Sequence, residues 1–167
     1  MLNTAKEIIE VCKKRKCHIY DLVLEEEIQT SKKTEEEIRL HLNEAFEVMN
    51  QSATENLEKA DRTEFRMIDG FAEKCHTYAK TKDPIVGSFL MDAMAMAFST
   101  GEVNSTMGKI IAAPTAGSSG ILPALMVSAK QRYQLDERTI QNGFLTSIGI
   151  GQIVGKYATF SGAEGGC

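Results

Sequence analysis

Apolar residues recur every three to four positions along the first part of the chain, which is the spacing of one face of an α-helix. The first such set consists of Ala5, Ile8, Ile9 and Cys12. It follows Thr4-x-x-Glu7, a capping-box sequence in which the threonine oxygen accepts a hydrogen bond from an N–H of the first turn. The pattern predicts a helix over residues 4–16, and a second, shorter one over residues 20–29 that ends in the polar stretch 30–33.

A longer amphipathic stretch follows the second capping box, Thr34-x-x-Glu37. Its apolar positions hold one stripe for about six turns: Ile38, Leu42, Ala45, Phe46, Met49, Ala53 and Leu57. The opposite face is acidic, as expected of a face in contact with solvent. The sequence predicts a helix from residue 34 to about residue 57, followed by an irregular stretch with some helix over residues 61–82.

The segment after Asp83-Pro84 is apolar on nearly all sides. Aspartate followed by proline is typical of a cap and the first turn of a helix. The sequence IVGSFLMDAMAMAFSTG then predicts a central helix. Met91, Met94 and Met96 are expected to fill the core, because methionines at helical spacing in an apolar segment are mostly packing residues.

Two further helices are predicted, over residues 120–133 and from residue 136 or 137 to about residue 157. The last one is rich in glycine, at Gly143, Gly149, Gly151 and Gly155. Glycine lowers helix propensity but permits close approach of a neighbouring helix. No stretch alternates with period two, so the predicted fold class is all-α, a helical bundle.

Charge and composition exclude several functions. The net charge of −4 and the interleaving of lysine with glutamate predict no nucleic-acid partner. No apolar run reaches the roughly 18 to 20 residues that span a bilayer, and the start lacks the pattern of a signal peptide. We therefore expect no membrane association and a cytoplasmic location. The final SGAEGGC, glycine-rich and ending on a thiol, suggests a fragment of a longer protein.

Four cysteines without an export signal are more typical of thiols or metal ligands than of disulfides. Cys12 and Cys17 lack a CxxC pattern and are interpreted as packing or surface thiols, and Cys75 as structural. For Cys167 the residues alone leave three options open: a cluster ligand, a nucleophile or a disordered end. A Cys–His pair is not favoured, because all three histidines lie in the first half of the chain.

The loop Pro114–Gly120, sequence PTAGSSG, offers backbone N–H groups and hydroxyls where a helix is predicted to begin. Such a helix N-terminus suits a carboxylate or a phosphate. The alternative is that the loop only caps the helix. It is not a nucleotide-binding P-loop, because Ile121 stands where the lysine of that motif would fall.

Two segments resemble the iron–sulfur L-serine dehydratase α chains of bacteria. Residues 102–126, EVNSTMGKIIAAPTAGSSGILPALM, are similar to that family's Glu-Val-Asn-Ala-x-Met-Gly-x-Ile-x-Ala-Ala-Pro-Thr-Ala-Gly. The tail 158–167, ATFSGAEGGC, is similar to its Ala-Thr-Ile-Ser-Gly-Ala-Glu-Gly-Gly-Cys. Asp21–Glu25 and the acidic helix after it also resemble the family. The resemblance therefore covers the whole chain and implies one truncated α-chain domain, residues 1–167.

The resemblance implies an enzyme that converts L-serine into pyruvate and ammonia. Cys167 would be the first of three protein ligands of a [4Fe–4S] cluster, incomplete in this chain alone, whose remaining iron activates the serine hydroxyl. A β subunit or β domain would complete the active site, within a homo- or hetero-oligomer. The chain by itself would be inactive.

The resemblance also implies a substrate pocket. The loop is expected to bind the substrate carboxylate through Thr115, Ala116, Gly117, Ser118 and Ser119. Asn104, Ser161 and Gly162 are secondary candidates for the pocket wall. Lys109 and Lys156 are secondary candidates for catalysis, although lysines beside glycine-rich helices are more often solvated tips or helix-end charges.

One stretch departs from the family. Where the family shows Ser-x-Ser-Gly-Leu-x-Gly-Gly-Asp-Ala-like sequence, residues 62–72 read RTEFRMIDGFA. This departure leaves two alternatives open: a non-catalytic helical module for binding or assembly, and a paralogous dehydratase of another hydroxy amino acid or hydroxy acid. A pyridoxal-phosphate enzyme is not favoured, because no lysine pairs with a phosphate-binding loop.

Overall fold

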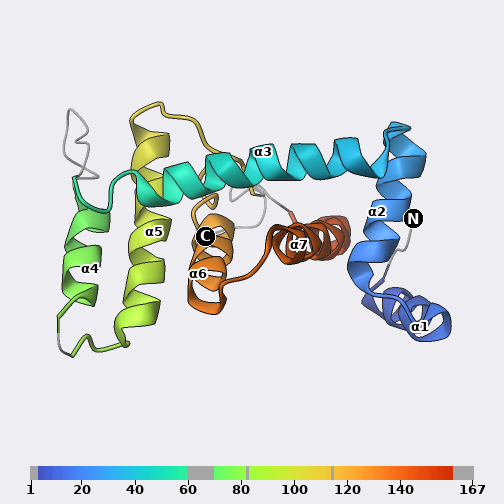
Figure 1. The fold of residues 1–167 in the computed structure, drawn as a ribbon, viewed down its shortest axis with the longest axis horizontal. Helices are drawn as coiled ribbons and strands as arrows, with labels where there is room; N and C mark the ends of the chain where they lie inside the picture. The colour runs from blue at the N-terminus through green and yellow to red at the C-terminus, as the bar shows by residue number, and fades with distance from the viewer. Residues whose placement is uncertain (1–3, 60–69, 82, 114, 160–167) are drawn as a thin grey trace. The chain divides into compact units, whose positions relative to one another are not determined.

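The computed structural model describes residues 4–59, 70–81, 83–113 and 115–159. Over these ranges the chain forms seven α-helices and no strand, which confirms the predicted all-α class (Figure 1). The helices are α1 (Ala5–Arg15), α2 (Ile19–Ser31), α3 (Glu35–Thr54), α4 (Phe71–Ala79), α5 (Ser88–Ser105), α6 (Ile121–Tyr133) and α7 (Glu137–Tyr157). No helix in the described ranges is both long enough and apolar enough to cross a bilayer.

The helix starts confirm most of the capping signals. Thr4 Oγ1 accepts a hydrogen bond from the backbone N–H of Glu7 (3.2 Å). The second capping box is complete, because Thr34 Oγ1 accepts from Glu37 N (3.2 Å) and Thr34 N donates to Glu37 Oε2 (2.8 Å). Asp136 caps α7, because its Oδ1 accepts a hydrogen bond from the backbone N–H of Thr139, the third residue of the helix (2.6 Å). These side chains satisfy N–H groups that the first turn of a helix leaves unpaired.

The predicted start of the apolar helix at Asp83-Pro84 is wrong. Gly87 N donates to Pro84 O (2.8 Å), which closes a turn, and Gly87 has a φ of 79° that ends any helical path from Pro84. Helix α5 therefore begins at Ser88 and runs on to Ser105. The prediction for its methionines holds for Met96, which is buried, but not for Met94, which is 39% exposed.

Contacts divide the helices into two compact units. The first unit comprises residues 1–43 and 136–167, and the second comprises residues 44–135. In the first unit α2 packs against α7. A Cβ at Gly149 would lie 2.5 Å from Val23 Cγ2, so this glycine permits the close packing that the sequence predicted. Gly143 and Gly151 have no such neighbour within 4 Å.

A buried arginine joins α3 to α7 inside the first unit. Arg39 is 8% exposed. Its Nε donates to Glu35 Oε1 (2.7 Å), and its Nη1 donates to Gln141 Oε1 (2.9 Å) and Asn142 Oδ1 (3.2 Å). Buried charges need such partners, because an unpaired one would be strongly destabilising.

In the second unit α5 packs against both α4 and α6, and Figure 1 shows α4 beside α5. Small and flexible side chains fill the contacts, among them the fully buried Met96, Ala72 and Val127. The last turn of α3 and the residues after it are tied to α5 by Ser99, whose hydroxyl donates to Ser52 O (2.7 Å) and accepts from Asn56 N (3.1 Å). This unit contains the loop 115–120.

Candidate functional site

The loop before α6 forms a hydrogen-bonded turn, residues 115–120, which we call the serine turn. The hydroxyls of Thr115 and Ser118 lie 3.0 Å apart and share a hydrogen bond. The backbone N–H of Ser118 donates to Thr115 Oγ1 (3.3 Å). Hydroxyl-to-backbone bonds of this kind stabilise short turns and favour them over other conformations. Both side chains are half-buried.

Ser119 fixes the turn from the inside. It is 1% exposed, and its hydroxyl donates to Ala116 O (2.6 Å). The backbone N–H of Ser119 points to the same carbonyl (3.4 Å). The Ser119 hydroxyl is therefore occupied by the turn itself, whereas Ala116 and Gly117 are exposed.

Ala116 and Gly117 present backbone N–H groups at the exposed end of the serine turn. Both residues are exposed, and neither N–H has an acceptor among the described residues. Gly120, the N-cap of α6, offers no side-chain oxygen to the first turn. Unpaired amides and the positive end of the α6 dipole thus coincide, an arrangement that favours an anion.

The serine turn borders a hollow of about 330 Å³. Its lining comes from the turn, from the start of α6, from the middle of α5 and from the first residue of α4: Gly117, Ser118, Gly120, Ile121, Ala97, Phe98, Gly101 and Phe71. The rings of Phe71 and Phe98 lie against each other with centroids 5.8 Å apart. The hollow therefore combines mostly apolar walls with one polar edge, as small-molecule sites commonly do.

Gly120 brings the turn into contact with α5. A Cβ at this position would lie 2.4 Å from the backbone oxygen of Ala97 and 3.2 Å from its Cα. No larger residue fits such an approach without backbone movement. The glycine therefore sets how closely the serine turn approaches α5.

Glu102 is a residue of this region that sequence reasoning did not select. It is 1% exposed, and its Oε1 accepts hydrogen bonds from the backbone N–H groups of Phe71 (2.7 Å) and Ala72 (3.3 Å). The carboxylate thus caps α4 from α5 and holds Phe71, a wall of the hollow. A lone glutamate inside an apolar helical segment was the available signal, because such a charge needs a buried partner.

Comparison with known proteins identifies the family. Residues 14–167 match the family described as serine dehydratase alpha chain. This chain belongs to that family. The resemblance noted from residues 102–126 and 158–167 is thereby confirmed, and the match favours a dehydratase over a non-catalytic helical module.

Two relatives of this chain are named as α chains of an L-serine dehydratase. An L-serine dehydratase, alpha chain, of Peptoniphilus asaccharolyticus is 65% identical over 167 residues, which is 100% of this chain and 57% of the relative. A probable L-serine dehydratase, alpha chain, of Bacillus subtilis is 30% identical over 167 residues, 100% of this chain and 55% of the relative. The chain thus spans little more than half the length of these relatives. No solved structure gave a significant match.

The other predicted residues of the serine dehydratase α chain lie in different places. Asn104 is half-buried, three residues beyond Gly101 on α5. Lys109 is exposed after the end of α5, and Lys156 is exposed in the last turn of α7, which belongs to the other unit. Three predicted residues, Ser161, Gly162 and Cys167, lie outside the described residues, as does the departing stretch up to Asp69.

The three described cysteines, Cys12, Cys17 and Cys75, are half-buried free thiols. Burial and the neighbouring Cys17 thiol raise the pKa of Cys12, and burial followed by the charge of Glu102 raises the pKa of Cys75. Raised values favour the neutral thiol, whereas iron binds the thiolate. Within the described ranges no three potential ligands among His, Cys, Asp and Glu gather at one point.

Proposed function

We propose that this chain is part of an L-serine dehydratase and that its serine turn binds the carboxylate of L-serine. The enzyme would convert L-serine into pyruvate and ammonia. The observation that supports this proposal most is the serine turn itself: in a member of the serine dehydratase α chain family, a turn with two unpaired amides borders a hollow of about 330 Å³ through Gly117 and Ser118.

The carboxylate would lie at the exposed end of the turn. The N–H groups of Ala116 and Gly117 and the hydroxyls of Thr115 and Ser118 are its proposed donors, while Ser119 keeps the turn in shape. A hydrogen bond to a charged group contributes about 1.5–3 kcal/mol, so two or three of them would hold a small substrate. Neutralising the carboxylate also makes removal of the α proton easier, because less negative charge builds up beside it.

The apolar walls would enclose the reacting carbons. Phe71 and Phe98 line the hollow beside the turn, and their rings would limit the access of water. Exclusion of water strengthens the hydrogen bonds to the carboxylate. Asn104, Ser161 and Gly162 remain candidates for the rest of the wall.

The reaction needs a base and help for a poor leaving group. A base removes the α proton, water leaves, and the resulting aminoacrylate tautomerises and is hydrolysed to pyruvate and ammonia. Lys109 and Lys156 are the candidates for the base that this chain offers. A [4Fe–4S] cluster, with Cys167 as one ligand, would supply Lewis acidity toward the hydroxyl.

The remaining parts of the enzyme are proposed from the relatives. Both α-chain relatives are longer than this chain, and we expect the other cluster ligands in the portion of their length that it does not span. The description as an alpha chain supports a β partner that completes the active site. L-serine is the proposed substrate because the relatives are named for it.

The proposal can be tested by following pyruvate formation from L-serine. The full-length α chain with its β partner would be reconstituted with iron and sulfide without oxygen, as wild type and as Cys167→Ala. A Ser31→Ala variant is a matched control, because Ser31 belongs to the other unit and its hydroxyl bonds only nearby backbone, donating to Glu27 O (2.8 Å) and accepting from Lys33 N (3.3 Å). We expect iron-dependent pyruvate release in the wild type and control and its loss in Cys167→Ala. Release without iron would contradict the cluster, and no release at all would contradict the proposed reaction.

A further inference from the structure

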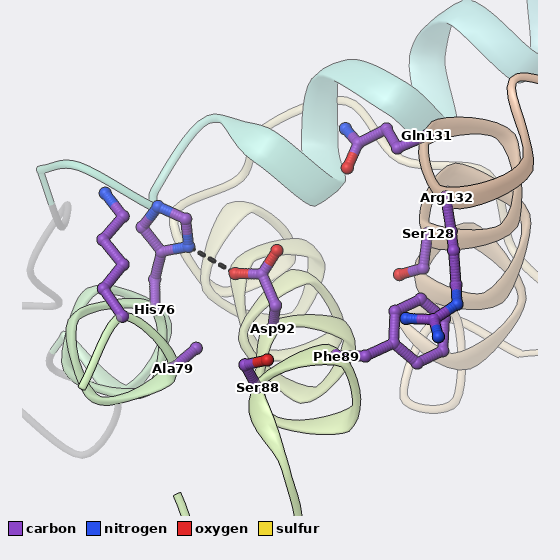
Figure 2. Close-up of a pocket in the computed structure, with 9 residues that line it drawn as sticks. His76, Ala79, Ser88, Phe89, Asp92, Ser128, Gln131 and Arg132 are labelled. Atoms are coloured by element: carbon purple, nitrogen blue, oxygen red, sulfur yellow. Dashed lines mark hydrogen bonds and ion pairs between the residues drawn. The ribbon is translucent and has the colours of Figure 1, made fainter. Parts of the chain in front are cut away.

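A second hollow lies in the same unit, between α4, α5 and α6 (Figure 2). It measures about 440 Å³ and shares no lining residue with the hollow beside the serine turn. We call it the mixed-charge groove. Its polar lining consists of His76, Lys80, Ser88, Asp92, Ser128, Gln131 and Arg132. Side chains of both charges thus converge from three helices on one open space.

Arg132 on α6 is held by aromatic rings and not by an acid. Its guanidinium carbon lies 4.5 Å from the centroid of the Phe89 ring and 5.9 Å from that of Tyr133. Among the described residues no carboxylate pairs with it. Stacking on an aromatic face fixes the plane of a guanidinium while leaving its N–H donors available. Such an arginine is arranged to bind a planar carboxylate through two parallel hydrogen bonds.

Asp92 on α5 forms the acidic side of the groove. His76 Nδ1 donates to its Oδ1 (2.5 Å), as the dashed line in Figure 2 shows. The histidine is itself held from its other nitrogen by Glu58 (3.3 Å), which also pairs with Lys80 (3.0 Å). The second oxygen of Asp92 has no partner among the described residues, and the side chain is 33% exposed. Asp92, which lines the groove, is therefore fixed in place with one oxygen that has no partner among the described residues.

We propose that the mixed-charge groove binds a free α-amino acid in its zwitterionic form. The carboxylate of the ligand would bind Arg132, its ammonium group would bind Asp92, and its side chain would lie toward Ser88 and Gln131. A simple anion would leave the second oxygen of Asp92 without a donor, and a simple cation would leave Arg132 without an acceptor. A ligand that carries both charges pairs with Arg132 and with Asp92 at once, and such charge complementarity makes a polar site specific.

The volume of the groove agrees with a small ligand, since sites for small molecules occupy roughly 300–1,000 Å³. The groove uses none of the residues assigned to the substrate carboxylate, so it would be an additional amino-acid site and not a part of the proposed active site. The inference therefore goes beyond the proposed function and does not depend on it.

Hydrogen–deuterium exchange of the full-length α chain with its β partner tests the proposal. The probe is L-alanine, which is a zwitterion without a hydroxyl to eliminate. We expect L-alanine to slow exchange at the start of α5 and the end of α6 in a saturable manner. Propionate, which lacks the ammonium group, and ethylamine, which lacks the carboxylate, should each require at least about tenfold higher concentration for the same protection, a difference of roughly 1.4 kcal/mol.

Substitutions test whether Arg132 and Asp92 bind the two charged groups of the ligand. Arg132→Gln and Asp92→Asn should each weaken the protection by L-alanine at least tenfold. Arg132→Lys keeps the charge but loses the two parallel N–H donors of the guanidinium. This variant should bind L-alanine more weakly than the wild type and more strongly than Arg132→Gln. Lys14→Gln is the matched control, because Lys14 is an exposed cation of the other unit. Unchanged exchange of α4 without ligand checks that Asp92→Asn has not released His76 from its place.

The outcomes separate the groove from the proposed reaction. Protection at α5 and α6 that Arg132→Gln abolishes would support the groove, even in a preparation that forms no pyruvate. Protection confined to residues 115–120 would overturn the groove and leave the proposed function standing. Equal protection by propionate and L-alanine would overturn the proposal of a zwitterionic ligand. L-alanine binding that neither Arg132→Gln nor Asp92→Asn weakens would overturn it as well.

Discussion

Replacement of Gly120 by alanine should destabilise the protein, although alanine is normally the better helix residue. The backbone of Gly120 has a φ of −76° and a ψ of −24°, which alanine adopts without strain. The loss of stability therefore arises from the steric clash of the added Cβ alone. The added Cβ would lie 2.4 Å from Ala97 O, a backbone atom of α5 that cannot rotate away.

The magnitude follows from the movement that this contact demands. A carbon and a carbonyl oxygen normally approach no closer than about 3.3 Å, so the turn and α5 must separate by nearly 1 Å. Overpacking of this kind costs typically 1–3 kcal/mol. The displaced elements are the serine turn and the wall of its hollow, so substrate binding should weaken together with stability.

Urea unfolding followed by circular dichroism measures the effect. With a slope of about 2 kcal/mol per molar urea, Gly120→Ala should lower the midpoint by roughly 0.5–1.5 M. Gly101→Ala is the matched comparison, because Gly101 lines the same hollow and a Cβ there would meet no atom within 4 Å. That variant should be neutral or more stable by up to about 1 kcal/mol. Equal midpoints for Gly120→Ala and the wild type would refute the close packing of the turn on α5.

Three further predictions concern buried and paired charges. Arg39→Ala should lower the free energy of unfolding by about 2–3 kcal/mol in urea titrations, because buried Gln141 loses its donor. Glu102→Ala should cost a similar amount and increase hydrogen exchange at the first turn of α4, whose amides lose their acceptor. Hydrogen bonds from Arg39 and then Arg138 lower the pKa of Glu35. Charged Glu35 therefore stabilises the fold above the ordinary carboxyl pKa, and this contribution is lost as the pH falls through the lowered value. The stability difference between wild type and Glu35→Gln should thus shrink from about pH 7 to about pH 3; a constant difference would contradict the ion pair.

Local signals were sufficient to predict most helices. The capping boxes at Thr4 and Thr34 and the cap at Asp136 each place a side-chain oxygen next to the first N–H groups, so the sequence alone indicates where these helices start. The start at Asp83 was wrong because Pro84 is equally compatible with a turn. The positive φ of Gly87, which decides between the two, depends on the path of the chain and leaves little trace in the pattern.

The candidate site was predictable only in part, because much of it also depends on the path of the chain. The serine turn is made of consecutive residues, so the sequence alone could select it as a candidate, whereas the hydrogen bonds between its Thr and Ser residues are seen only in the structure. The hollow beside it needs Phe71 from α4 and Phe98 from α5, residues whose contact depends on tertiary packing. The same holds for the bond from α4 to Glu102 and for the pairing of His76 with Asp92. Periodicity identifies faces of helices but does not tell which faces meet.

The most direct test of the account is the steady-state kinetics of the reconstituted full-length enzyme with a Ser118→Ala substitution, measured as pyruvate release across a range of L-serine concentrations. The proposed role of the serine turn in binding the carboxylate predicts that kcat/KM falls about 10- to 100-fold, the equivalent of one charge-assisted hydrogen bond, while Ser31→Ala changes nothing. A Ser118→Ala enzyme with the kcat/KM of the wild type would contradict the assignment of the turn to the substrate.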